Sequence, residues 1–348
     1  MHFDIVIYKL QMINILKNDK ITRQYLESNM KKRFHLLIII GILLAGFIVG
    51  SFLDFQIDQA LFQKNNGFGL FMASFGVYPC YAGLAFIGGG FLATSIRRKD
   101  FPLWAKIICY GVSGVAYGMA IYLCGKELPS VNGYNRPDLA ILSYAICAVV
   151  FGGVFVGAYF VCRKGDEKQL WNILLVMSVI FILGLLPAGF LIKLVIHRPR
   201  FRLYMEDAEI PFRNWWDSFK EYKEFLANHP EGFTYADGFP LTKEEFKSFP
   251  SGHSGTGMIM AMFLPFMSYF FPKLKGKEIF LYYGGVAFSL LMMFSRMLVG
   301  AHYLTDTCMG SLIVMVVYFV VNEFAYRKHF YDDKSQVIKE EVAVQEQK

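Results

Sequence analysis

Three short polar clusters interrupt long apolar stretches in the second half of this chain. They span residues 193–201, 249–255 and 295–306. Their basic side chains, small residues and histidines are the residue types that bind anions and transfer protons. Ionisable residues within or at the ends of apolar segments are energetically costly, so their presence there is informative. The three clusters are therefore the first candidates for a functional site.

The first two clusters contain groups that bind an anion. Lys193 and Arg200 place two cations at the end of one apolar run, although lysines at such ends are often simple interfacial anchors. Ser251 and Gly252 open the next run, and small residues at a helix start leave backbone N–H groups free to hold an anion. His253 follows directly. Alone, this second cluster could also be a capping turn with an incidental histidine.

The third cluster adds a second histidine with a carboxylate beside it. His302 and Asp306 are four residues apart and share a face if the segment is helical. A carboxylate that holds one imidazole N–H leaves the other nitrogen as a nucleophile or base. An isolated histidine–aspartate pair is more often structural than catalytic, but the presence of Arg296 and His253 weakens the structural interpretation. Phosphoryl transfer needs cations around the phosphoryl oxygens, an in-line nucleophile and an acid for the leaving oxygen, and the clusters supply each.

Metal and disulfide chemistry are not indicated by the sequence. No carboxylate cluster accompanies the histidines, so we expect metal-independent chemistry without a cofactor. The six cysteines lie within or at the ends of apolar runs and form no CxxC pair, which predicts small buried residues. They are Cys80, Cys109, Cys124, Cys147, Cys162 and Cys308.

The elements that must position these residues are predicted to be membrane-spanning helices. The chain is 55% hydrophobic and only 18% charged, whereas a soluble domain carries roughly 25% charged residues. Its apolar residues form runs long enough for the roughly 20 residues that cross a bilayer. We expect an all-α polytopic bundle of about eight spans. The expected spans are 35–55, 69–95, 103–124, 139–162, 170–195, 254–272, 278–299 and 302–325.

Two glycine groups within these spans bear on packing. Residues 88–90 interrupt the second span and predict either close helix packing or a kink. Gly152, Gly153 and Gly157 in the fourth span favour close packing.

Four regions are expected along the chain. Residues 1–34 are a basic segment that suits either an amphipathic helix on an anionic membrane surface or an ordinary tail. Residues 35–100 hold two additional N-terminal spans, 101–326 the core with an outward loop at 201–250, and 327–348 a charged tail. Within the loop, aromatic residues at three- and four-residue steps predict an amphipathic helix over 212–227, acting either as a lid or as packing on the spans.

Loop charge predicts the orientation. Lysine and arginine gather in both terminal segments and near 97–99, 163–168 and 273–277. The positive-inside rule then places both termini in the cytoplasm and the three clusters on the extracytoplasmic face. The basic residues that flank the apolar runs account for the formal net charge of +7. The sequence shows no basic face with stacking aromatic residues, which a nucleic-acid-binding surface would need. The compact loops and the lack of recognised sorting signals favour a bacterial cell membrane.

The clusters resemble the three motifs of the type 2 phosphatidic acid phosphatase superfamily. Pro250 to His253 match the family's second motif, Pro-Ser-Gly-His, and residues 295–306 match the third, Ser-Arg-x5-His-x3-Asp. The first motif, Lys-x6-Arg-Pro, is matched except that Phe201 stands in place of the proline, and Pro199 can supply similar rigidity. The resemblance covers about residues 170–325. Because the family's usual core has six spans, the first two spans look like an addition.

The resemblance implies a role for each residue. His302 would attack phosphorus and form a phosphohistidine, Asp306 would orient it, and His253 would protonate the leaving oxygen. The phosphate oxygens would be held by Lys193, Arg200, Ser251, Gly252 and Arg296. His197 and Arg198 are expected to be interfacial residues rather than supports of the site.

A membrane phosphatase acting on a lipid phosphate or diphosphate is the function that the resemblance implies. An isoprenyl diphosphate, such as undecaprenyl diphosphate, and a glycerolipid phosphate both fit. The alternatives are a lipid-linked phosphotransferase with an alcohol acceptor and a catalytically inactive transporter or scaffold. The expected partners are the phosphorylated lipid and the bilayer, and the sequence predicts no oligomeric state.

Overall fold

The computed structural model describes residues 20–130, 137–164, 167–206, 210–219, 221–228 and 243–323, and this part of the chain contains helices and no strands. The chain divides into two compact units, Met1–Ile42 and Leu43–Lys348. The first unit contributes the beginning of helix α2, Lys20–Leu61. Most of the predicted N-terminal basic segment and the predicted C-terminal tail lie outside the described residues.

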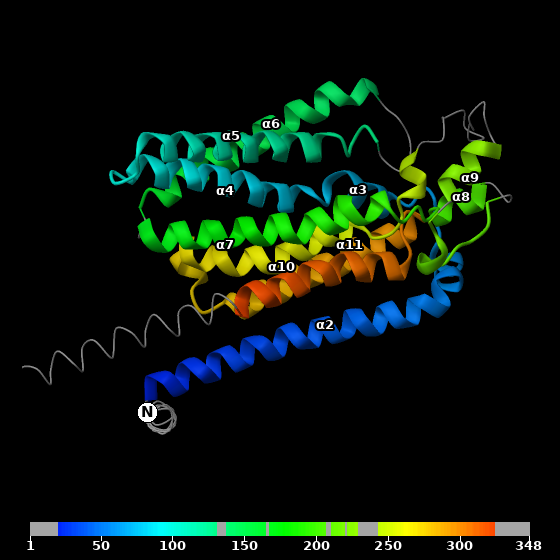
Figure 1. Cartoon of the computed structure of the whole chain (residues 1–348), viewed down its shortest axis with the longest axis horizontal. Helices are drawn as coiled ribbons and strands as arrows, with labels where there is room; N and C mark the ends of the chain where they lie inside the picture. The colour runs from blue at the N-terminus through cyan, green and yellow to red at the C-terminus, as the bar shows by residue number, and fades with distance from the viewer. Residues whose placement is uncertain are drawn as a thin grey trace, which may run out of the picture. The chain divides into compact units, whose positions relative to one another are not determined.

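Long helices make up the larger unit (Figure 1). After α2 come α3 (Gly67–Phe75), α4 (Tyr78–Arg97), α5 (Leu103–Gly125), α6 (Ala140–Cys162), α7 (Glu167–Leu186), α10 (Gly252–Phe270), α11 (Glu278–Leu298) and a final helix, Leu304–Glu323. A π-helical turn, Pro187–Leu191, and a 3-10 turn, Ile192–Leu194, extend α7 to the first polar cluster. The expected polytopic all-α class is confirmed.

Seven helical segments in the described part of the chain are long and apolar enough to cross a membrane. They are Arg33–Leu61, Gly67–Arg97, Leu103–Gly125, Pro137–Cys162, Gln169–Leu194, Glu278–Leu298 and Leu304–Glu323. Helix α10 covers the expected sixth span but is not among them. Its first six residues, Gly-His-Ser-Gly-Thr-Gly, are polar or small and reduce its apolar length.

Close packing, rather than a kink, explains residues 88–90. Helix α4 runs unbroken through them and packs against α5, α6 and α7. A Cβ atom on Gly89 would lie 2.1 Å from the carbonyl oxygen of Phe155, so only glycine permits this approach. The break in the predicted second span falls instead between α3 and α4, at Gly76 and Val77. In α6 the prediction of close packing is wrong for Gly153 and Gly157, where an added Cβ atom would meet nothing within 4 Å.

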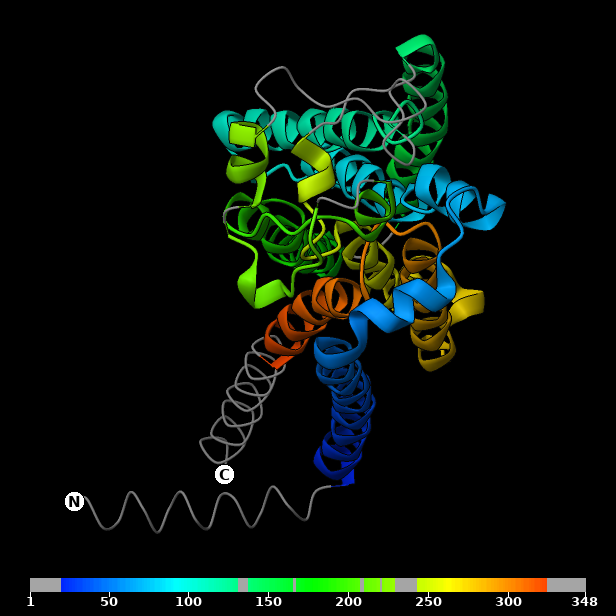
Figure 2. The ribbon, with the colours of Figure 1, turned by 90° about the vertical axis from the view of Figure 1, so that its right-hand side faces the viewer.

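The three polar clusters meet at one end of the larger unit. Helix α10 packs against α7 and α11, and short connections make α10, α11 and the final helix alternate in direction. The end of α7, the start of α10, the end of α11 and the start of the final helix therefore come together. In Figure 2 this end faces the viewer, and α8 and α9 lie across it.

The predicted helix over 212–227 is wrong. In its place the described residues form a single 3-10 turn, Trp215–Asp217, and a separate helix α9, Glu221–Asn228. Ser218 lies between them with φ −132° and ψ 57°, outside helical values, and its carbonyl oxygen accepts the backbone N–H of His197. That hydrogen bond ties the loop to the first polar cluster, which local periodicity does not reveal.

Candidate active site

His302 lies at the centre of the three clusters, on the connection between α11 and the final helix. Its side chain is almost fully buried, and its Nδ1 lies 2.6 Å from the backbone oxygen of Ser248. Because a carbonyl oxygen only accepts hydrogen bonds, this contact requires the proton on Nδ1 and leaves a lone pair on Nε2. Nε2 faces Nη1 of Arg200 at 3.4 Å. His302 therefore has the tautomer that a nucleophile needs.

The surroundings of His302 keep its imidazole neutral. Burial lowers the pKa of His302 well below its usual range, and the nearby cations Arg200, Lys193 and Arg296 lower it further. A neutral imidazole retains its lone pair at neutral pH. The same cations attract the negative charge of a phosphoryl group.

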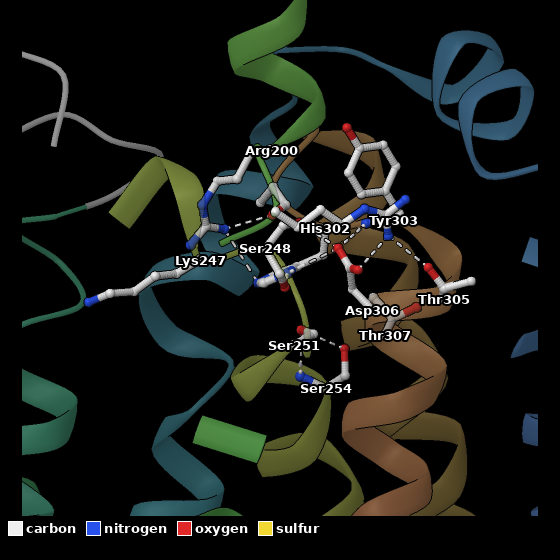
Figure 3. Close-up of polar contacts among 12 residues, drawn as sticks. Arg200, Lys247, Ser248, Ser251, Ser254, His302, Tyr303, Thr305, Asp306 and Thr307 are labelled. Atoms are coloured by element: carbon white, nitrogen blue, oxygen red, sulfur yellow. Dashed lines mark hydrogen bonds and ion pairs between the residues drawn. The ribbon is translucent and has the colours of Figure 1, made fainter. Parts of the chain in front are cut away.

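Asp306 is near His302 but is not its closest acceptor. The Oδ2 atom of Asp306 lies 3.8 Å from Nδ1 of His302, and it accepts the backbone N–H of Tyr303 at 2.9 Å and the Ser248 hydroxyl. Ser248 thus contacts both residues, since its hydroxyl donates to the carboxylate and its carbonyl accepts from the imidazole (Figure 3). The expected direct hydrogen bond from histidine to aspartate is replaced by this bridge.

Arg198 is a support of the site and not an interfacial anchor. It is completely buried, with Nη1 2.7 Å from Oδ1 of Asp306 and Nη2 2.9 Å from Oδ2 of Asp54 on α2. Its guanidinium carbon lies 3.8 Å from the ring centroid of Tyr303. Burial alone would lower the pKa of Arg198, but the Asp306 and Asp54 carboxylates outweigh burial and raise it. His197 is also buried, so the interfacial interpretation is wrong for both residues.

Three cations of the polar clusters, Lys193, Arg200 and Arg296, lie near enough to His302 to lower its pKa. Nζ of Lys193 donates to the carbonyl oxygen of Lys247 at 3.0 Å. Nη1 of Arg200 donates to the carbonyl oxygen of Ala301 at 2.7 Å. Arg296 differs from both: it is 4% exposed, and its Nε and Nη1 atoms have no hydrogen-bond acceptor in the described part of the chain. Buried guanidinium donors of this kind favour an anionic ligand.

The start of α10 forms one wall of the site. Ser251 is its N-cap, and the Ser251 hydroxyl accepts the N–H and the hydroxyl of Ser254 (Figure 3). The Ser251 N–H donates to the carbonyl oxygen of Asp306 at 2.9 Å, so this amide is already used. The amides of Gly252 and His253 occupy the first helical turn, where no intrahelical acceptor exists. These two amides, with the helix dipole behind them, are the ones suited to an anion.

His253 has a carboxylate neighbour that sequence reasoning missed. Its Nε2 lies 3.3 Å from the carbonyl oxygen of Ala73 and 3.5 Å from Oε2 of Glu127, in the connection after α5. Burial raises the pKa of Glu127, while the cations Lys126, Arg296, Lys193 and Arg200 act in the opposite direction. Glu127 thus faces the same cations as the predicted anion site. No motif at residue 127 indicated this placement.

Phe201, which replaces the motif proline, packs in an aromatic cluster. It begins the short helix α8, Phe201–Glu206, and its side chain is fully buried. Its ring contacts Phe55, Phe62, Tyr204 and Tyr303 with centroid separations of 5.4–6.1 Å. The substitution leaves Arg200 held in place, since its backbone N–H donates to the carbonyl oxygen of Glu245 at 2.9 Å.

Within the described residues, no group of three or more histidine, cysteine, aspartate or glutamate side chains is placed to hold a metal ion. All six cysteines are buried thiols without disulfide partners.

The arrangement combines a neutral imidazole, three cations of which Arg296 has unused donors, helix-start amides and a second histidine. No curated protein and no solved structure matches the chain. Residues 169–330, which hold all three clusters, match the family model described as the PAP2 superfamily. This match confirms, for residues 169–330, the resemblance to the type 2 phosphatidic acid phosphatase superfamily that the three motifs carry.

Proposed function

We propose that this protein is a membrane phosphatase that hydrolyses a lipid phosphate or lipid diphosphate through a phosphohistidine on His302. The family match supports phosphatase activity on a phosphorylated substrate. The observation that carries the proposal is the pair of unused donors on buried Arg296, beside a neutral His302 whose Nε2 bears a lone pair. A phosphoryl group would accept those hydrogen bonds and present its phosphorus to that nitrogen.

The proposed reaction has two steps. In the first, Nε2 of His302 forms a bond to phosphorus as the bond to the leaving oxygen breaks, and His253 gives that oxygen a proton, which the Glu127 carboxylate 3.5 Å from its Nε2 helps it to carry. In the second, water attacks the phosphorus as the bond from Nε2 of His302 to phosphorus breaks, His253 takes a proton from the water, and inorganic phosphate leaves. Lys193, Arg200, Arg296 and the first-turn amides of α10 stabilise the charge on the phosphoryl oxygens in both steps.

The substrate proposal follows from where the site lies. The clusters are at the ends of helices that are long and apolar enough to cross a membrane. A lipid anchored in the bilayer carries its phosphate at the membrane surface, where the ends of these helices would lie. An isoprenyl diphosphate and a glycerolipid phosphate share this chemistry.

The test is phosphate release by the purified protein from isoprenyl diphosphates, phosphatidate, phosphatidylglycerol phosphate and sugar phosphates. We expect His302→Ala to abolish release, while His35→Ala, a histidine change outside the three clusters, retains it. Equal release by wild type and His302→Ala would refute the mechanism. Phosphate transfer that requires an added alcohol would replace hydrolysis by a phosphotransferase reaction.

A second test concerns the intermediate and the metal. Rapid quenching with radiolabelled substrate should trap a phosphoenzyme that is stable in alkali and labile in acid, as phosphohistidine is. We also propose that the reaction needs no metal, because cations of the protein occupy the role that metal ions fill elsewhere. Activity should survive a chelator, and a loss restored by added divalent ions would contradict this part of the proposal.

We further propose that the site faces away from the cytoplasm and that both termini are cytoplasmic, on the basis of loop charge. A reporter fused after Lys348 should then be active only on the cytoplasmic side. A reporter that is active on the extracytoplasmic side instead would show that the proposed topology is inverted.

A further inference from the structure

Asp54 lies on α2, outside the region that matches the family model, yet it reaches the site. Its side chain is 2% exposed. Oδ2 pairs with Nη2 of Arg198 at 2.9 Å and accepts the hydroxyl of Thr305, while Oδ1 accepts the Thr305 N–H at 3.0 Å. One carboxylate thus holds both the loop of the first cluster and the first turn of the final helix.

Arg198 transmits this contact to Asp306. The guanidinium is shared, since Nη2 faces Asp54 and Nη1 faces Asp306 and the Thr305 hydroxyl. Its Nε donates to the carbonyl oxygen of Arg213 at 3.0 Å, so the described contacts fix it on three sides. A buried cation between two carboxylates has a single low-energy position, and losing one partner leaves the remaining charges uncompensated.

The end of α2 also touches the connection that carries His302. The N–H of Gln63 donates to the carbonyl oxygen of Leu298 at 2.7 Å. A Cβ atom on Gly300, whose φ is +61°, would lie 2.7 Å from the ring of Phe62. The contact through Asp54 is therefore part of a wider seam between α2 and the segment around the nucleophile.

We propose that Asp54 is a positioning residue of the active site, which holds Arg198 against Asp306 and so makes α2 a working part of the catalytic unit. The proposal rests on the proposed phosphatase function for its kinetic readout. Asp54 touches neither His302 nor the expected position of the phosphoryl group. It acts on the orientation of Asp306 and, through Ser248, on His302.

Asp58 provides a matched control one helical turn further along α2. It is also fully buried, but both of its carboxylate oxygens lack a hydrogen-bond partner in the described part of the chain. Asp54→Asn and Asp58→Asn therefore make the same chemical change at neighbouring buried positions. Only the first removes a carboxylate that is paired with Arg198.

We expect Asp54→Asn to lower kcat by at least about 10-fold with KM little changed, because a misplacement of about 1 Å can cost about 100-fold in rate. Asp58→Asn should keep kcat within about threefold. The phosphate-binding residues stay in place in both variants, so the effect should appear in kcat. Equal losses in the two variants, or a wild-type kcat in folded Asp54→Asn, would overturn the proposal.

A double-mutant cycle with Asp306→Asn tests the route through Arg198. If Asp54 acts on Asp306, adding Asp54→Asn to Asp306→Asn should slow single-turnover phosphorylation no further. Full additivity would overturn the proposal. The same cycle can be measured by the thermal midpoints of the four proteins, which requires no activity. It therefore still tests the coupling between Asp54 and Asp306 if the wild type releases no phosphate and the proposed function fails.

Thr305→Val covers the case in which Asp54→Asn does not fold. This variant keeps both buried charges and removes only the hydroxyl that bridges Asp54 and Arg198. We expect a smaller loss of kcat with unchanged KM. A wild-type kcat in Thr305→Val would then count against the proposal.

Discussion

Replacing Gly310 with alanine should displace the turn that carries Ser251. Gly310 lies on the final helix, and a Cβ atom there would be 2.1 Å from the Ser251 carbonyl oxygen and 3.0 Å from its carbonyl carbon. Raising 2.1 Å to an ordinary contact of 3.4 Å requires a movement of about 1.3 Å. Both contacts are backbone atoms, so no flexible side chain can absorb the change.

The displaced turn starts α10, whose first-turn amides we assign to the phosphoryl oxygens. A shift of about 1 Å in such a group can cost about 100-fold in rate, so we expect kcat/KM of Gly310→Ala to fall by about 100-fold. The Ser251 N–H would also lose its hydrogen bond to the carbonyl oxygen of Asp306, now 2.9 Å long. Initial rates of phosphate release, measured in parallel with thermal midpoints, separate catalytic loss from unfolding.

Gly284→Ala is the matched control, because a Cβ atom there would meet no atom within 4 Å. Its kcat/KM should stay within about threefold of wild type, since exposed substitutions of this kind have small effects. A folded Gly310→Ala protein with wild-type kcat/KM would refute the assignment of the α10 start as the phosphoryl site.

Four further predictions concern the chemistry and the packing of the site. Because its pKa is lowered, His302 should stay neutral at about pH 6.5, the ordinary pKa of histidine. With a substrate that does not titrate in this range, the acid limb of the kcat/KM profile should therefore lie below about pH 6.5. An acid limb above about pH 6.5 would contradict the argument that burial lowers this pKa. The histidine contribution to stability follows the same sign: the unfolded chain binds the extra proton, so the thermal midpoint should fall as pH drops below about 6.5. Glu127→Gln should slow hydrolysis of alkyl phosphates by about 10-fold, part of what a general acid contributes, but leave aryl phosphates with good leaving groups nearly unaffected; equal effects on both would exclude a link to His253. Phe201→Ala should destabilise the fold by about 3–5 kcal/mol, seen as a lower thermal midpoint, and an unchanged midpoint would show that the aromatic cluster contributes little.

The local features of the site could be predicted from sequence, since motif spacing is a property of short segments. Lys193, Arg200 and Arg296 gather around His302 as expected, and the start of α10 was placed correctly. Gly153 and Gly157 were misjudged, because composition alone does not say which face of a helix has a neighbour.

The supports of the site could not be predicted, because they join distant segments. Asp54 and Arg198 are 144 residues apart, and nothing in either local pattern names the other. Arg198 resembled an interfacial anchor in sequence, and only the folded structure shows that it is buried and paired with two carboxylates. The periodicity over 212–227 likewise predicted a helix that does not form, because the tertiary hydrogen bond from the His197 N–H to the Ser218 carbonyl oxygen lies between the 3-10 turn and α9.

The pairing of Asp54 with Arg198 also bears on how the protein is made. Synthesis proceeds at about 5–20 residues per second, so the separation of 144 residues puts Arg198 about 7–30 s behind Asp54. During that interval α2 carries a carboxylate that the nascent chain cannot yet neutralise, and such a residue weakens a helix as a membrane segment. Chains that stop before Arg198 keep this unpaired acid in α2. Full compensation of this buried carboxylate therefore has to wait until the first polar cluster has been synthesised.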